Sequence, residues 1–587
     1  MASSVSTKEK IYNESFPYEK LPNSNYLRIL KLDPGKGIND ELLGTLETHP
    51  RKKSPPYRAL SYVWGPNERT KAMCCNKEQF LITDNLDAAM RRLRSSNHPI
   101  HLWIDQICIN QNDIEERSSQ VSFMRDIYSG AECVEAWLGP ATLEQAGHAA
   151  MLMTSIATLP DIPIPTNSAL TFPSDEKLQK LKLPTRSSPS WSSLETMLRL
   201  PYFKRVWIIQ EIVVASTYRL LWGSMEISKE QFDLFRANAI FLGTGEPDGR
   251  EDCPRLSVSN GYAAFGAMKG KNRDLFELAT ITLSYQATDP RDMIFALIGL
   301  ADGIDYGMVP DYNKEEGEVF ADFTSKVISA TKSLEILHYP VISDPSNAKH
   351  PLWAPRWQWH SDMLSLDFTE HDFRASGELE ARQGVSTDTN VMSLKGLEVD
   401  VVKETADRPV TTIKEAAESS NLIIKYQDLC TERYCLDIIR PFLLTLIGGR
   451  ERSDTLQHKL QPIKDDKYLD DFVAYAFSRF TTVLEKDMEL SRQLLLLMRR
   501  AVDSSNSSTK GSPSLKGTET FKWLKMVFGK IYLNDTEAIS SNLEMMKRIS
   551  CLGVERTLSF HRLMLRSARG RRFFVTEKGY HPGPPNA

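Results

Sequence analysis

A single carboxylate lies within a strongly apolar stretch of the chain. Residues 203–214 read FKRVWIIQEIVV, and Glu211 is the acidic residue among them. Because apolar residues cover most of the circumference of the helix that this spacing predicts, we expect the helix to be largely buried. An ionised carboxylate is costly in such surroundings unless it is paired, and burial raises its pKa. Beside a bound ligand, such a group could stabilise positive charge that develops during a reaction.

Trp207 precedes Glu211 by one helical turn and shares its side of the predicted helix, so its ring could stack on a ligand. The alternative interpretation is structural. Glu211 would then pair with Arg205, with Lys204 or with the end of a neighbouring helix. The residue types leave both interpretations open, because structural ion pairs perturb carboxylates as functional sites do.

A second group of polar residues accompanies the predicted strand 101–105, HLWID. Asp105 ends this strand, and ligands of doubly wound sheets bind beyond the carboxyl ends of strands. The alternative is that Asp105 accepts hydrogen bonds from the turn that follows. Asn110 and Gln111 could hydrogen-bond a ribose or hold the loop. Cys108 lies in the same loop, but no histidine is close in sequence to activate it, so we expect a small buried core residue.

Trp64 and Gly65 lie where another predicted strand, 58–64, ends. Glycine lacks a side chain and could let the backbone approach a ligand, although an ordinary turn is the alternative. Trp64 and Gly65 are therefore candidate binding residues.

Arg117 and Gln120, on a predicted helix further along the chain, could reach a phosphate or lie in solvent.

Short apolar runs alternate with helical patterns in the first third of the chain. Asp113 can cap a helix that ends before Gly130, with Glu116 three residues after the cap. Strands are predicted at 26–32, 58–64, 101–105 and 133–138, and a further helix at 85–93. This alternation predicts an α/β fold with a parallel sheet.

The remainder of the chain is predicted to be mainly helical. Asp289 caps a helix that has Pro290 in its first turn. An aromatic stretch interrupts the helical pattern, and its tryptophans are expected to serve as core or domain-docking residues: Trp353, Trp357 and Trp359. The last residues begin like a β-hairpin. The predicted fold class is thus an α/β N-terminal domain, a mainly α-helical region and a short C-terminal β segment.

The composition argues against several classes of protein. The 587 residues carry 72 Lys and Arg and 76 Asp and Glu, a net charge of −4, which does not favour a general nucleic-acid-coating role. The apolar runs are too short to span a membrane, and the N-terminus has no apolar core of a secretory signal. The eight cysteines are few and read as free thiols in a reducing compartment, so a cytoplasmic location is expected.

Strong catalytic and metal-binding motifs are missing from the sequence. It contains no GxxxxGK[ST] phosphate loop, no GxSxG elbow, no HExxH helix and no paired CxxC spacing. We therefore expect no metal site and no resident cofactor.

Three segments together resemble the fungal heterokaryon-incompatibility (HET) domain. They are YRALSYVWGP at 57–66, the segment LWIDQICINQ to AECVEAWLGP at 102–140, and FKRVWIIQEIVVAS at 203–216. Weaker similarity extends to ATDPRDMIFALIGLA at 287–301, VPDY at 309–312 and GRRFFVTEKGY at 570–580. Proteins of this family usually continue past the last motif with more β structure, so the resemblance implies a truncated or divergent C-terminal module.

The resemblance implies a role in fungal non-self recognition, with programmed cell death when incompatible partners meet. The HET domain has also been likened to TIR domains, which have a flavodoxin-like sheet and in some lineages cleave NAD. By that likeness 58–64 is the first TIR strand and Glu211 the catalytic residue, acting at C1′ of the nicotinamide ribose with Trp207 stacked on the ligand. The implied substrate-binding residues are Trp64, Gly65, Asp105, Asn110, Gln111 and Trp207.

Two other functions remain open. The domain could self-associate or bind a protein partner without catalysing a reaction, or the chain could be an accessory protein of a fungal metabolic gene cluster. The expected division of the chain is a flexible N-terminus (1–25), a HET domain (26–230) with a loop insertion (159–190), a helical region (231–345), an aromatic-rich connection (346–400), a helical domain (401–565) with a disordered segment (503–518), and a truncated β tail (566–587).

Overall fold

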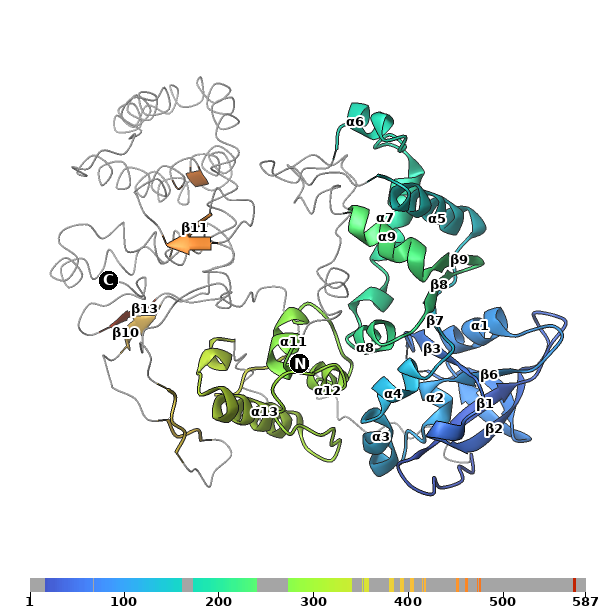
Figure 1. Cartoon of the computed structure of the whole chain (residues 1–587), viewed down its shortest axis with the longest axis horizontal. Helices are drawn as coiled ribbons and strands as arrows, with labels where there is room; N and C mark the ends of the chain where they lie inside the picture. The colour runs from blue at the N-terminus through green and yellow to red at the C-terminus, as the bar shows by residue number, and fades with distance from the viewer. Residues whose placement is uncertain are drawn as a thin grey trace, which may run out of the picture. The chain divides into compact units, whose positions relative to one another are not determined.

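A computed structural model of the chain describes most residues up to 357 and short pieces beyond (Figure 1). The described residues are 16–66, 68–160, 173–239, 273–339, 351, 353–357, 380–384, 391–394, 402–405, 414, 416, 418, 450–452, 460–462, 472, 475–476 and 574–576. They divide between two compact units. The first runs to Thr331 and includes 351–357, and the second holds the other described pieces from Lys332 onward.

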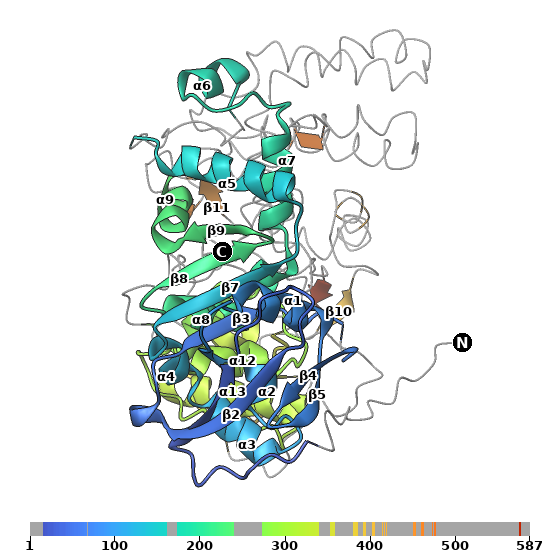
Figure 2. The same ribbon diagram turned by 90° about the vertical axis from the view of Figure 1, so that its right-hand side faces the viewer.

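A nine-stranded mixed sheet forms the centre of the first unit, in the order β5-β4-β2-β1-β6-β3-β7-β8-β9. Figure 2 shows the succession β3, β7, β8 and β9. The strands are β1 Tyr26–Leu32, β2 Leu43–Pro50, β3 Arg58–Tyr62, β4 Lys71–Cys75, β5 Glu78–Ile82, β6 Ile100–Trp103, β7 Cys133–Gly139, β8 Tyr218–Trp222 and β9 Met225–Ser228.

The parallel sheet expected from the sequence is only partly correct. Strand β3 pairs in parallel with β6 and β7, and β7 in parallel with β8, but β1 pairs antiparallel with β2 and β6. Some strands were missed because their residues are largely polar. β2, with the sequence LGTLETHP, has a largely half-exposed burial pattern and so lacks a continuous apolar run. The strands missed from sequence are β2, β4, β5, β8 and β9.

The helices between β5 and β7 differ from the prediction in two respects, the first being the short helix α2 (Asp105–Cys108), which was not predicted. Helix α1 (Asp84–Leu93) is confirmed, capped by Thr83. The single helix expected between Asp113 and Gly130 is two helices, α3 (Ile114–Val121) and α4 (Met124–Ser129), because the backbone leaves the helical conformation at Phe123. Asp113 caps α3 as predicted, accepting from the Glu116 amide.

Three helices gather at the β8–β9 end of the sheet (Figure 1). They are α5 (Leu143–Ala157), α7 (Pro189–Leu198) and α9 (Lys229–Ala239). Part of the insertion expected to be a loop is helical, since α6 spans Asp175–Lys180 with Ser174 as its cap. A short 3₁₀ helix, η2 (Pro201–Lys204), precedes α8 (Trp207–Val213), and another, η1 (Arg51–Lys53), follows β2.

The helical region beyond α9 belongs to the same unit up to Thr331. It contains α11 (Leu275–Ile281), α12 (Asp292–Ile298) and α13 (Glu316–Thr331). Trp357 is fully buried and packs edge-on against Phe276 and Phe323, which confirms its expected core position. Helix α12 begins two residues later than predicted, and Asp289 accepts from the Arg291 amide just before it.

Phe16 and Tyr18 are packed although the first 25 residues were expected to be loose. Phe16 is buried against Phe80, and the Tyr18 hydroxyl donates to the Ile107 carbonyl at 3.0 Å. The chain is therefore anchored to the sheet from Phe16 onward.

The second unit is described only in pieces. It contains η4 (Glu335–His338), and strand β13 (Phe574–Thr576) pairs antiparallel with β10 (Val402–Thr405). A strand thus lies in the tail as predicted, but its partner is distant in sequence. A second pair joins β11 (Arg450–Arg452) and β12 (Leu460–Pro462). The tryptophan at 359 and the segment 503–518 lie outside the described residues. In the described part of the chain, no helix combines the length and apolar character needed to cross a membrane.

Candidate functional site

Glu211 lies on α8 against the inner strand β3 and is 1% exposed. The Ser61 hydroxyl donates to its Oε2, and the Ser61 oxygen also shares a hydrogen bond of 2.7 Å with the Tyr202 hydroxyl. Its other oxygen, Oε1, lies 3.8 Å from Arg205 Nη1 and accepts no hydrogen bond. The expected burial of this carboxylate is therefore present, and so is the ion pair offered as the structural alternative.

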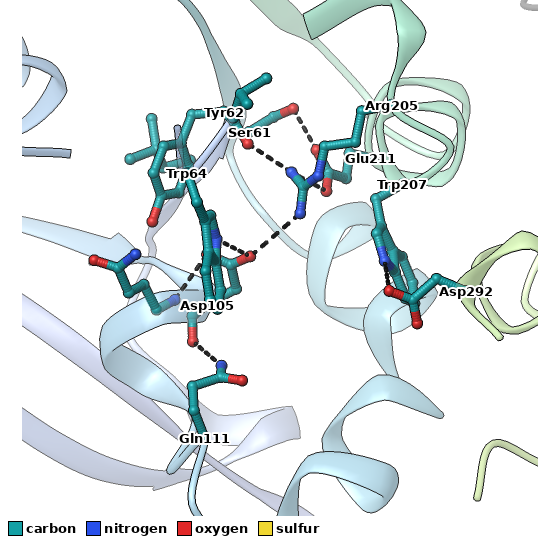
Figure 3. Close-up of polar contacts among 12 residues, drawn as sticks. Ser61, Tyr62, Trp64, Asp105, Gln111, Arg205, Trp207, Glu211 and Asp292 are labelled. Atoms are coloured by element: carbon teal, nitrogen blue, oxygen red, sulfur yellow. Dashed lines mark hydrogen bonds and ion pairs between the residues drawn. The ribbon is translucent and has the colours of Figure 1, made fainter. Parts of the chain in front are cut away.

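Arg205 joins Glu211 to the second predicted acid (Figure 3). Its Nη2 lies 3.7 Å from Asp105 Oδ2, and its Nη1 donates to the Tyr62 carbonyl at 2.5 Å. The Arg205 side chain is 21% exposed, whereas the two carboxylates lie deeper. One guanidinium thus faces both acids, so Glu211 and Asp105 lie close to the same arginine.

The backbone at Arg205 explains this position and corrects the predicted helix 203–214. Arg205 has an extended conformation, with φ −79° and ψ 129°, between η2 and α8. The Val206 amide donates to the Gln286 carbonyl at 2.9 Å, and the Gln286 amide donates to the Lys204 carbonyl at 2.6 Å. Pairing with a segment 81 residues away thus interrupts the helix that the apolar pattern predicts, an override that local periodicity cannot reveal.

Asp105 does not end a strand as expected, because β6 stops at Trp103 and Asp105 is the first residue of α2 (Asp105–Cys108). Its carboxylate accepts from the Trp64 indole at 3.0 and 3.1 Å and from the Gln106 amide at 2.7 Å. The alternative of a turn acceptor is thus correct. Burial raises the pKa of Asp105, while Arg205 and the Trp64 hydrogen bond act in the opposite direction.

Burial also raises the pKa of Glu211, to about 7, although the Arg205 charge and the Ser61 hydrogen bond lower it. Asp105, as a second acid nearby, adds to the upward shift. A carboxyl group with a pKa near neutrality can hold or release a proton under cellular conditions. The arrangement therefore places a carboxyl group that titrates near neutrality beside a less buried cation, Arg205.

Asn110 and Gln111 hold the loop after α2. Gln111 Nε2 donates to the Asp105 carbonyl at 2.8 Å, and Asn110 Oδ1 accepts from the Asn112 amide at 3.2 Å. Glu116, expected to reach back to the cap, instead accepts from the Asn110 amide at 2.7 Å and pairs with the buried Arg28 at 2.6 Å. Both amide side chains thus have structural contacts, and their contact with a ribose stays a prediction.

Trp64 and Gly65 lie at the turn after β3. Gly65 has φ +77°, a conformation that favours glycine, so the turn itself accounts for this residue. Trp64 is partly exposed, with Arg69 about 6.0 Å from the centre of its ring. The indole is thus fixed by Asp105 on one edge.

Trp207 points away from the Arg205 cluster (Figure 3). Its indole donates to Asp292 Oδ2 at 2.9 Å, and the Tyr312 hydroxyl donates to the other oxygen of Asp292 at 2.5 Å. The structure therefore brings Trp64, Asp105 and Glu211 together around Arg205 but ties Trp207 to α12. Stacking of Trp207 on a ligand stays a prediction.

Arg117 and Gln120 pack within the protein rather than lying free in solvent, and their contact with a phosphate stays a prediction. The Arg117 guanidinium lies 3.7 Å from the centre of the Tyr312 ring and 3.2 Å from Asp289, and Gln120 is buried and donates to the Tyr26 carbonyl. Cys108 is a buried core thiol as expected, with its pKa raised to about 12 by burial.

Sequence reasoning missed Ser61 and Tyr202 as neighbours of Glu211, whereas Arg205 was among the ion-pair partners that it offered. Ser61 gives a weak signal, since it is a hydroxyl within the buried strand β3 and such a group needs a partner. Tyr202 gives none, because nothing in its neighbourhood distinguishes it from an ordinary core tyrosine. Among the described residues, no group of three or more His, Cys, Asp or Glu is placed to hold a metal ion.

Residues 57–211, which contain this whole cluster, match the family model described as heterokaryon incompatibility protein (HET). The chain is similar to heterokaryon incompatibility protein 6, OR allele, of Neurospora crassa, with 27% identity over 500 residues that cover 73% of this chain and 72% of that protein. No solved structure gives a significant match.

Proposed function

Because this chain is a HET-domain protein, homologous to a Neurospora heterokaryon incompatibility protein, we propose that it is an effector of non-self recognition that promotes programmed cell death in a fungus. The observation that carries the proposal is the family match over 57–211, which spans the buried cluster around Arg205. The likeness to the Neurospora protein covers nearly three quarters of both chains, which supports a shared role beyond one domain.

Inducible expression of the full chain in a fungal host tests this function. We expect loss of viability, measured by dye uptake and colony formation, in proportion to the amount of protein. The control is the Glu226→Gln variant, since Glu226 forms a partly exposed ion pair with Arg219 on the edge strand β9, whereas Glu211 is buried on α8. A chain that accumulates to high level without any loss of viability would argue against an effector role.

For the chemistry of killing we propose NAD cleavage with Glu211 as the catalytic carboxylate and Asp105, Trp64, Gly65, Asn110 and Gln111 around the substrate. The support is electrostatic. A carboxylate with a pKa near 7 can stabilise the positive charge that develops on the ribose as nicotinamide leaves, and Arg205 can bind a phosphate of the nucleotide.

This chemistry requires a local movement. Glu211 is 1% exposed, and its oxygens face Ser61 and Arg205, so a ribose can reach the carboxylate only after Arg205 moves away. A phosphate that pairs with Arg205 would compete directly with Glu211 and Asp105 for its charge. The substrate would therefore help to uncover the carboxylate that acts on it.

Nicotinamide release by the purified full chain tests the chemistry. We expect slow release that Glu211→Gln abolishes, because the amide carries no negative charge, while Glu226→Gln retains it. Release that is unchanged in Glu211→Gln would remove this residue from the mechanism.

A second candidate function is that of a non-catalytic interaction domain, either self-associating or binding a protein partner. The deep burial of Glu211 favours it, since an ion pair and a Ser61 hydrogen bond are sufficient structural reasons for this residue. Cell death without any loss of cellular NAD would favour this function over cleavage.

A further inference from the structure

The segment 285–312 lies outside the family match, which ends at Glu211. It nevertheless contacts Val206 and Trp207 at the start of α8. It includes the sequences DPRD at 289–292 and VPDY at 309–312. Neither of these two sequences has a part in the proposed function. Their contacts indicate how they support the Arg205 cluster.

The first contact is through the main chain. Gln286 hydrogen-bonds on both sides of Arg205, accepting from the Val206 amide at 2.9 Å and donating to the Lys204 carbonyl at 2.6 Å. These two bonds hold Arg205 in its extended conformation. The guanidinium can then extend toward Tyr62, Asp105 and Glu211, which a helical backbone at this position would not ensure.

The second contact is through Asp292, the first residue of α12, which is 8% exposed. Two buried donors converge on its carboxylate, the indole of Trp207 at 2.9 Å and the hydroxyl of Tyr312 at 2.5 Å. Trp207 is the first residue of α8, so Asp292 fixes the helix that carries Glu211 (Figure 3). Removing this acceptor would leave two buried donors unpaired.

A third set of contacts holds Tyr312 in place. Its ring lies under the Arg117 guanidinium at 3.7 Å, and Asp289 pairs with Arg117 at 3.2 Å and with Arg291 at 2.8 Å. Arg291 in turn donates to the Tyr312 carbonyl at 2.9 Å. The segment thus contacts α3 as well as α8, through Asp289, Asp292 and Tyr312.

We infer that residues 285–312 are an integral part of the HET unit, in which Gln286 and Asp292 are positioning residues for Arg205 and for the start of α8. This inference rests on the proposed function only in treating the Arg205 cluster as the working site. The positions themselves follow from the contacts. The functional unit therefore extends about a hundred residues beyond the family match.

Hydrogen–deuterium exchange on the full chain tests the positioning. In Asp292→Ala we expect the amides of 206–213 to exchange about tenfold faster or more, because two donors lose their acceptor. Asp292→Asn keeps an acceptor for the Trp207 indole and should restore most of the protection. The matched control is Asp322→Ala on α13, which removes only a partly exposed ion pair with Lys314 and Lys326.

The amides of β1 serve as the internal reference for general loosening. Unchanged exchange at 206–213 in Asp292→Ala, or equal acceleration in 206–213 and β1, would overturn the inference. If Asp292→Ala does not accumulate as folded protein, Tyr312→Phe removes one donor without opening a cavity and is judged by the same criteria.

Cell killing by the same variants separates this inference from the proposed function. We expect Asp292→Ala to reduce killing and Asp292→Asn to recover it. Increased killing by Asp292→Ala would overturn the inference, since the segment would then restrain the HET unit rather than position it. If the wild-type chain does not kill at all, the proposed function fails, and the exchange measurement alone decides the positioning.

Discussion

The guanidinium of Arg205 lies 3.8 Å from the carboxylate of Glu211, near enough for strong attraction but beyond hydrogen-bond distance. The same group lies 3.7 Å from Asp105, so one cation serves two acids that burial has partly removed from water. The protonation of each acid therefore depends on where Arg205 lies. This dependence leads to measurable effects of pH and of single substitutions.

The stability of the first unit should fall as the pH rises through the range set by Glu211. Its pKa is about 7 in the folded chain against an ordinary 4.5, so the folded state binds the proton more tightly than the unfolded state does. The favourable contribution is complete below about pH 4.5 and is lost by about pH 7, a change of about 3 kcal/mol in the free energy of unfolding. Thermal denaturation of wild type and Glu211→Gln between pH 4.5 and 8 measures it.

The difference between these two proteins is the quantity that matters, since other groups titrate in the same range. We expect the wild type to lose stability relative to Glu211→Gln as the pH rises. A difference that stays constant with pH would show that Glu211 titrates at its ordinary value.

Arg205→Met should destabilise the chain by about 1–3 kcal/mol at pH 8 and by less at pH 5. At the higher pH both acids would be charged without their cation, whereas at the lower pH Glu211 is protonated. Melting temperatures at the two pH values provide the measurement. Arg199→Met is the matched control, because Arg199 forms an exposed ion pair within α7. Equal losses at both pH values would contradict the proposed coupling.

Arg28→Met should be strongly destabilising. Arg28 is 2% exposed and donates to both oxygens of Glu116 at 2.6 and 2.9 Å, as well as to the Cys108 carbonyl. The substitution would leave Glu116 as an unpaired, nearly buried charge, which costs about 3–5 kcal/mol. Chemical denaturation measures the loss. A change below 1 kcal/mol, no larger than that of Arg199→Met, would indicate that water replaces the arginine.

Cys108 should resist alkylation in the folded chain. Its thiol is buried and its pKa is raised to about 12, so the reactive thiolate is scarce as well as covered. Among the described cysteines, Cys74, which is partly exposed on β4, should react before Cys108. Mass spectrometry of peptides after brief iodoacetamide treatment, with and without denaturant, tests the order. Rapid labelling of Cys108 in the native chain would contradict it.

The sequence predicted the elements whose signals are local. The apolar runs indicated β1, β3 and β7, and the helical spacing of residues 85–93 indicated α1, although its Thr83 cap was not predicted. Polar strands such as β2 and β5 were not predicted, because their own residues show no apolar run and their place in the sheet depends on pairing with β1 and β4. Mixed strand direction also depends on pairing, so the predicted parallel sheet was only partly correct.

The features of the candidate site that depend on local sequence were also predictable, and those that depend on distant contacts were not. Burial of Glu211 followed from its apolar neighbours, whereas a common site for Asp105 and Glu211 was implied only by the likeness to TIR domains. The contacts that organise the site did not, because Gln286 and Asp292 lie about 80 residues further along the chain. No local pattern indicates that main-chain hydrogen bonds to Gln286 keep Arg205 in an extended conformation, or that Trp207 donates to a carboxylate.

Killing by Glu211→Gln at matched protein level tests the central claim most directly. The measurement is the fraction of dead fungal cells after induced expression of wild type and variant, with their amounts equalised by immunoblot and their folding compared by melting temperature. We predict that the wild type kills and that the folded variant kills at least tenfold less. Equal killing by the two proteins would contradict the assignment of Glu211 to the working site, and survival of the wild-type cells would contradict the effector function itself.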